Sequence, residues 1–235
     1  VGFQAGAAVT TGTRNTVIGA LAGDAITTGA RNTVLGWGAL SLEDVGSRST
    51  AIGHNALTAQ NVDGNVYNTA VGYDAGGAIT EGVNNTLMGG LAGDALTESN
   101  SNVAIGYAAL SAETLGGSNV AVGSNALIVQ NVGADGNNVA VGYKAGFDNE
   151  SGKFNTVVGS QAFVENVQGD NNTAIGCFSL QDFVADADGD GDNTAVGARA
   201  MLNATTGTSN TAVGAEAMGS GVTTGNNNVG VGRRS

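Results

Sequence analysis

A five-residue motif recurs along the whole chain. Residues 68–72 read Asn-Thr-Ala-Val-Gly, residues 102–106 read Asn-Val-Ala-Ile-Gly and residues 138–142 read Asn-Val-Ala-Val-Gly. Counted from Gly2 to Gly232, most successive motif glycines are 17 residues apart. A fixed period of this kind indicates a stack of similar structural units. The sequence therefore predicts one solenoid segment over residues 1–235, with about 13 coils of 17 residues.

Each motif is typical of a short, doubly apolar β-strand. Numbered from the glycine, position −3 is Thr or Val, position −2 is mostly Ala or Val, and position −1 is Val, Ile, Leu or Met. Side chains alternate along a strand, so positions −3 and −1 share one face and position −2 lies on the other. One face can fill the coil while the other packs against something else. The remaining residues suit a second short strand, with two turns in each coil.

The residues that flank the strand have structural roles in this interpretation. Asn at position −4 suits a corner and can form a ladder of buried hydrogen bonds along the stack. The motif glycine permits a sharp bend, and apolar residues at position −1 support the rod. The residues expected to do this include Asn15, Asn32, Asn68, Asn85, Asn102, Asn119, Asn138, Gly72, Gly106, Gly142, Ile105 and Val122.

A longer period is also present. Residues 21–27 and 91–97 are nearly identical, and so are the starts of segments 54–64 and 124–134. This indicates four-coil blocks at 2–71 and 72–141 and a degenerate block at 142–235. Inserts before Asn68, Asn138, Asn193 and Asn228 are expected in outer turns, which solenoids tolerate. A coil this thin leaves a strand face uncovered, and three copies around a threefold axis would bury it.

The motif resembles the head repeats of trimeric autotransporter adhesins with YadA-like heads, and repeats of phage and bacterial tail-fibre proteins. The resemblance covers the whole chain and is carried by fourteen copies in phase, such as residues 102–106. It implies a left-handed parallel β-roll, three chains wide, in an extracellular, protease-resistant fibre. It also implies a surface that contacts a host-cell glycan or protein.

Composition narrows the function classes. A formal charge of −12 with only 8 Lys and Arg argues against a nucleic-acid partner. No apolar run approaches the ~20 residues that span a bilayer, so we expect no membrane insertion in this segment. The chain opens inside a motif and lacks an initiator Met, which indicates a piece of a longer protein. Its single Cys177 and single His54 are best explained as substitutions in the position +1 column.

An acidic stretch at 186–193 resembles half of a calcium-binding loop. Alternating carboxylates in a glycine-bent loop supply the oxygen ligands that Ca²⁺ prefers. The position that would hold the bidentate Glu is Gly197, so a solvated acidic loop is the alternative. The candidate metal ligands are Asp186, Asp188, Asp190 and Asp192, and no other cofactor is expected.

Aromatic side chains recur at position +1, at about every second coil. They could form a stacking ladder for glycan rings, or they could pack across a subunit interface. The candidate surface residues are Trp37, Tyr73, Tyr107 and Tyr143, and Phe3 and His54 occupy the same column.

These patterns predict a structural, self-associating rod and no enzyme, and the resemblance implies an adhesive, homotrimeric fibre segment on a virion or bacterial surface. One alternative is a glycan-degrading tailspike, which would need a paired-carboxylate cleft that the sequence does not show. The other is an ice-binding solenoid, which would need an exposed Thr array. Val residues interrupt the Thr column at position −3, which favours burial of that column.

Overall fold

The computed structural model is an all-β parallel solenoid and describes residues 1–185, 191–220 and 224–235. The chain divides into two compact units, residues 1–117 and 118–235. In the first unit a parallel sheet runs in chain order through strands that contribute one three-residue element to each coil: β1 (Thr16–Ile18), β2 (Thr33–Leu35), β3 (Thr50–Ile52), β4 (Thr69–Val71), β5 (Thr86–Met88) and β6 (Val103–Ile105).

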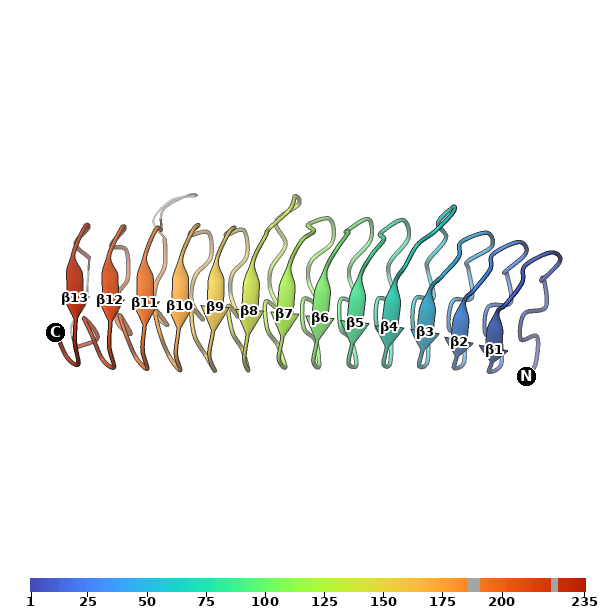
Figure 1. Ribbon diagram of the computed structural model, residues 1–235, viewed down its shortest axis with the longest axis horizontal. Helices are drawn as coiled ribbons and strands as arrows, with labels where there is room; N and C mark the ends of the chain where they lie inside the picture. Colours follow the sequence, from blue (N-terminus) through green and yellow to red (C-terminus); the bar gives the residue numbers. More distant parts are fainter. Residues whose placement is uncertain (186–190, 221–223) are drawn as a thin grey trace. The chain divides into compact units, whose positions relative to one another are not determined.

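The second unit repeats this arrangement with its own strands. They are β7 (Val120–Val122), β8 (Val139–Val141), β9 (Thr156–Val158), β10 (Thr173–Ile175), β11 (Thr194–Val196), β12 (Thr211–Val213) and β13 (Val229–Val231). Within each unit successive strands lie side by side, as Figure 1 shows. Their register aligns motif with motif, so that Thr69 pairs with Thr86 and Val71 with Met88.

The sequence correctly predicts which side chains alternate, and the structure shows which face is internal. Position −2 is buried in every strand of the part of the chain that is described, apart from a half-buried Val17 in the first coil. Positions −3 and −1 point outward and are half-buried or exposed. Ile105 and Val122 therefore lie on the outer face of their strands. Within the coil, Ala side chains at positions −2 and +3 keep the interior narrow.

The second half of the coil differs from the expected second strand. No second strand occurs among the described residues of any coil. Residues at positions +2 and +4, such as Asn55 (φ 55°) and Leu57 (φ 52°), adopt left-handed backbone angles that break an extended conformation. The turns still stack, because Leu57 donates its backbone N–H to the Ala75 carbonyl of the next coil at 3.1 Å.

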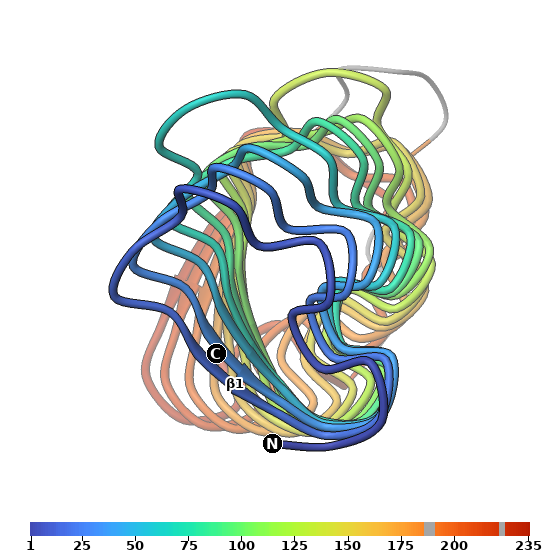
Figure 2. The same ribbon diagram turned by 90° about the vertical axis from the view of Figure 1, so that its right-hand side faces the viewer.

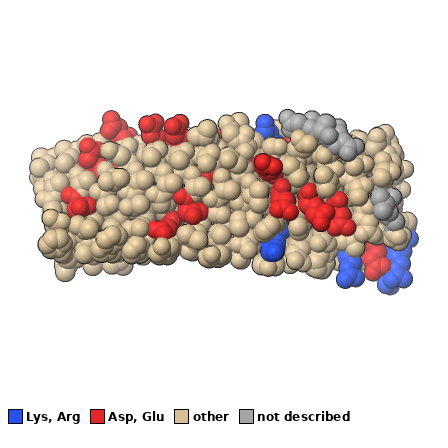
Figure 3. Space-filling model, turned by 180° about the vertical axis from the view of Figure 1, so that it is seen from behind, with Lys and Arg blue, Asp and Glu red and all other residues tan. Residues whose placement is uncertain are grey.

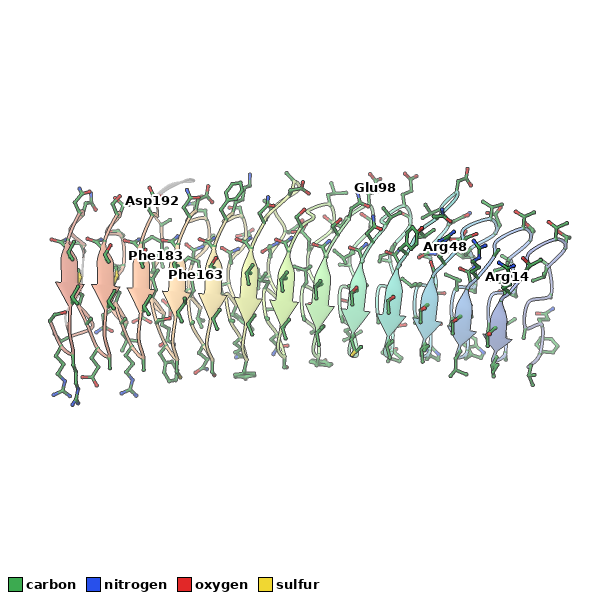
Figure 4. All side chains as sticks on the ribbon, viewed as in Figure 1. Arg14, Arg48, Glu98, Phe163, Phe183 and Asp192 are labelled. Carbon is green, nitrogen blue, oxygen red and sulfur yellow. The ribbon has the colours of Figure 1, made fainter. Side chains whose placement is uncertain are left out.

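Size compensation inside the coil explains the four-coil block. Where position +4 is Gly23, Ile26 at position +7 fills the space, and a Cβ on Gly23 would lie 2.7 Å from Ile26 Cδ1. Where position +4 is Leu40, position +7 is instead the polar Glu43. In the second unit two larger rings fill the interior of neighbouring coils, and Phe163 and Phe183 stack at 6.0 Å (Figure 4).

The asparagine ladder is present in both units. The backbone N–H of Asn85 donates to Asn68 Oδ1 at 2.8 Å, and Asn85 Oδ1 in turn accepts from the N–H of Asn102 at 2.9 Å. Asn85 Nδ2 donates to the Ser99 carbonyl at 2.8 Å. Each buried Asn thus satisfies backbone groups that would otherwise cost about 1–3 kcal/mol each. In unit 2 the same bonds join Asn119 to Asn138 and continue to Asn228.

Two of the inserts lie in outer loops, as predicted. Gly64 and Gly133, in the inserts before Asn68 and Asn138, have open space around them. Figure 2 shows both loops projecting beyond the turns of the neighbouring coils. Residues 186–190, which carry the insert before Asn193, and residues 221–223, near the insert before Asn228, lie outside the described residues.

The motif glycine is required by contact between coils. At Gly72 (φ 147°) a Cβ would collide with the carbonyl oxygen of Gly89 in the next coil. The same collision recurs along the glycine column, for example between Gly142 and Gly159. The backbones of successive coils therefore approach so closely here that no side chain fits.

This contact yields a matched test. Gly72→Ala should lower the free energy of unfolding by about 3 kcal/mol or more, because it combines backbone strain with overpacking. Gly64→Ala should cost only about 1 kcal/mol. A Cβ on Gly64 (φ 90°) would meet no atom within 4 Å, so only backbone strain remains. Urea denaturation followed by circular dichroism measures both. Equal losses would show that coil-to-coil contact is not what selects glycine.

Candidate binding surface

Three aromatic rings stack on successive coils of the first unit. Trp37 and His54 have ring centroids 4.9 Å apart, and His54 and Tyr73 are 5.3 Å apart, with interplanar angles of 17° in both pairs. All three occupy position +1, directly after the bend at the motif glycine, and all are exposed. Trp37 keeps 49% of its surface and Tyr73 keeps 56%. The three rings are called the aromatic stack below.

The spacing of the rings differs from the expected one, and a role in glycan binding or subunit contact stays a prediction. The rings stack at consecutive coils through His54, and not at every second coil. Tyr107 and Tyr143 are also exposed, but neither takes part in a ring stack among the described residues. Gly90 occupies position +1 in the coil before Tyr107. The 17-residue step from Trp37 to His54 was the sequence signal for the stack.

A groove of about 320 Å³ lies beside the aromatic stack. Its walls come from positions +2 and +5 of three coils, together with Trp37 and Leu42: they include Leu21, Asp24, Gly38, Ser41, Asn55 and Thr58. The Ser41 and Thr58 hydroxyl groups hydrogen-bond to each other at 3.1 Å. The half-buried Asp24 has one carboxylate oxygen, Oδ1, that is buried with no hydrogen-bond partner among the described residues. Its hydrogen-bonding capacity is thus incompletely used within the chain.

A second groove, of about 510 Å³, lies beside the first insert. Its lining is mostly polar and acidic, and comprises Asp44, Asn61, Val62, Asp63 and Glu81. Acidic residues also form groups elsewhere, as on the face shown in Figure 3. The chain has 20 Asp and Glu against 8 Lys and Arg, so acidic groups outnumber basic ones more than twofold.

The candidate calcium loop falls mostly outside the described residues. Asp186, Asp188 and Asp190 lie there, and only Asp192 is described. Asp192 (φ 56°) donates its backbone N–H to the Asp170 carbonyl at 3.2 Å, at the turn before β11 (Figure 4). The described residues contain no group of three or more acidic, His or Cys side chains placed to hold a metal. Calcium binding stays a prediction.

Two columns with functional interest were not singled out from the sequence. Arg14, Arg31 and Arg48 are exposed and lie 17 residues apart at the turns before β1, β2 and β3; Figure 4 labels the first and last. The Arg48 guanidinium lies 5.3 Å from the centre of the Tyr67 ring in the next coil. The repeat spacing was the signal for this column.

Cys177, like His54, is exposed at position +1.

The second missed column is a row of buried polar residues at position +7. Glu43 is fully buried, and its Oε1 accepts the N–H of Gly46 at 2.6 Å. Its Oε2 accepts from Gln60 Nε2 at 2.9 Å and from the N–H of Val62 at 3.2 Å. Gln60 Oε1 in turn accepts from Asn68 Nδ2 at 2.9 Å, which joins this network to the asparagine ladder.

Burial raises the pKa of the Glu43 carboxyl, although hydrogen bonds from Gln60, Gly46 and Val62 act in the opposite direction. Desolvation also raises the pKa of Asp94, Asp148 and Asp182. A carboxyl whose pKa is raised by folding binds its proton more tightly in the folded chain. Its contribution to stability is present below the ordinary pKa and is lost as pH rises through the raised pKa.

The melting temperature should therefore fall as pH rises from about 4.5, the ordinary pKa of Glu, toward neutrality. Glu43→Gln should make this fall smaller, because it removes one of the responsible groups. Glu98→Gln, at an exposed position, should keep the wild-type pH dependence. Thermal melts followed by circular dichroism at several pH values test this. An unchanged slope in Glu43→Gln would contradict it.

Comparisons with known proteins give no assignment. No family model matches the chain, and no curated protein or solved structure matches it. Among the described residues, no helix has the length and apolar character needed to cross a membrane. The geometry of the chain is thus the basis for any functional conclusion.

Proposed function

We propose that this chain is a structural and adhesive segment of a trimeric extracellular fibre. The observation that carries the proposal is the outward face of the strands. Positions −3 and −1 form an outward strip of Thr and large apolar side chains along each unit, and these side chains are half-buried or exposed. Its most exposed large side chains include Ile18, Leu35, Met88, Val158, Ile175 and Val213.

An apolar strip of this kind favours association. Leu35 keeps 44% of its surface and Met88 keeps 47%. Contiguous exposed apolar surface commonly marks an interface, and a parallel sheet is usually covered on both faces. In three copies around a threefold axis, the strip of each copy would pack against the strips of the other two. The aromatic stack, at position +1, would then lie beside the strands at the edge of this contact. Rotational symmetry of this kind is the common form of homo-oligomers.

The coil-to-coil bonding supports a mechanical role. Successive coils within each unit are joined by backbone bonds, by the asparagine ladder and by the close glycine contacts. Each coil depends on its neighbours, which is the property of a stiff repeat array. A stiff array suits a fibre that presents a contact surface at a distance from its anchor.

Sedimentation equilibrium tests the proposal. The wild-type segment should have a mass three times 22.9 kDa. Leu35→Lys should lower the trimer content at a given concentration by more than tenfold, because it places three charges in the buried strip. Leu115→Lys is the matched control: Leu115 is 49% exposed but lies outside the strands. A monomeric wild type would overturn the trimer.

A second candidate function is ice binding, which one observation favours. The Thr side chains at position −3 were expected to be buried, but in the single chain they lie on the outward face. Five consecutive coils of the first unit carry them in register, at Thr16, Thr33, Thr50, Thr69 and Thr86. A regular hydroxyl array could order water. A thermal-hysteresis assay with no effect would remove this candidate.

A further inference from the structure

The aromatic stack exposes three rings along the direction in which the coils repeat, with His54 stacked between Trp37 and Tyr73. The ring centroids are 4.9 and 5.3 Å apart, and all three side chains are exposed. Exposing three large rings together has a cost, since aromatic side chains gain more by burial. The backbone does not require rings here, because other coils carry Gly or Ala at position +1, as at Gly90 and Ala198.

A sugar ring matches this surface chemically. The C–H groups on one face of a pyranose carry slight positive charge, and they pack on the negative face of an aromatic ring. A sugar can pack on the face of Trp37 and on the face of Tyr73 that are turned away from His54, so the stack can hold two sugars of one extended chain. The ligand class is therefore an oligosaccharide and not a single sugar.

The groove beside Trp37 supplies the polar half of such a site. Asp24, Asn55 and the Ser41–Thr58 hydroxyl pair all line it, and each offers groups that bond to sugar hydroxyls. Apolar rings joined by a few convergent polar groups are the usual composition of a ligand site.

The charge around the rings selects against acidic ligands. Asp24 lines the groove, and the Tyr73 hydroxyl hydrogen-bonds to Asp74, which raises the pKa of Tyr73. The chain also carries a formal charge of −12. A polyanion would be repelled by these carboxylates, whereas neutral hydroxyl groups can donate to them.

We propose that Trp37, His54 and Tyr73, with the adjoining groove, bind an extended neutral oligosaccharide along the coil direction. This names a ligand class for the adhesive surface and so rests on the proposed function. The second block provides an internal comparison in sequence. The positions 70 residues further on are Tyr107, Ser124 and Tyr143, so the middle ring is missing there.

Trp37 is the only Trp, so its fluorescence reports on this site alone. The probes are cellohexaose and chitohexaose, with an alginate hexamer as the anionic comparison. We expect a saturable change in emission with at least one of the neutral probes and a weaker or absent response to alginate. No saturable response to either neutral probe, or a response to alginate alone, would overturn the proposal.

Variants locate the response. His54→Ser, which copies the second block, and Tyr73→Ala should each weaken binding about fivefold or more, because each removes a stacking ring. Tyr143→Ala is the matched control, since Tyr143 is 48% exposed in the same column without a stacked ring, and it should change the affinity less than about twofold. Equal effects of all three variants would contradict the assignment.

Two measurements separate this proposal from the fibre itself. A trimeric wild type that binds neither neutral probe would keep the fibre and remove the glycan site. A monomeric wild type that binds one of them through the stack would do the reverse. If Trp37→Ala reduces the trimer mass to that of a monomer and the wild type binds no sugar, the rings are a contact between protomers.

Discussion

The close approach of successive backbones at the motif glycine is the contact on which each unit depends. A Cβ at Gly36, Gly53 or Gly72 would collide with the next coil. The coil therefore cannot shift along the stack without breaking the register of strands and ladder together. This explains why a chain with 40 Gly and no Pro forms ordered layers and not a flexible linker. The glycine makes the stack tight, and the stack then holds every outward residue at a fixed repeat.

The narrow interior follows from the same contact. Ala at most of positions −2 and +3 leaves a narrow space that side chains at positions +4 and +7 fill. In the coil that has Gly23 at position +4, Ile26 at position +7 fills the interior. In the coil that has Leu40 at position +4, position +7 is Glu43. A buried carboxyl is tolerated because three donors reach it. The four-coil period is thus a packing pattern.

Much of this fold could be predicted from the sequence, because the same residue types recur at the same positions in most coils. The strands, the asparagine ladder and the two described insert loops were expected where they occur. The missing second strand could not be predicted, because it depends on left-handed angles at residues such as Asn55 and Leu57, which have side chains and give no glycine signal. Burial of Glu43 could not be predicted, because its three donors come from residues that the repeat pattern does not single out. His54 was treated as a substitution in the position +1 column. Its stacking between Trp37 and Tyr73 depends on how successive coils align, which the sequence does not show directly.

The insert loops at Gly64 and Gly133 lie away from the glycine column, and a Cβ on either glycine would meet no atom within 4 Å. Their length is therefore uncoupled from the axial rise, which the glycine column holds constant. Changes in the length of these loops would alter the surface that they form. The distance between repeated groups on the rest of each unit would stay the same.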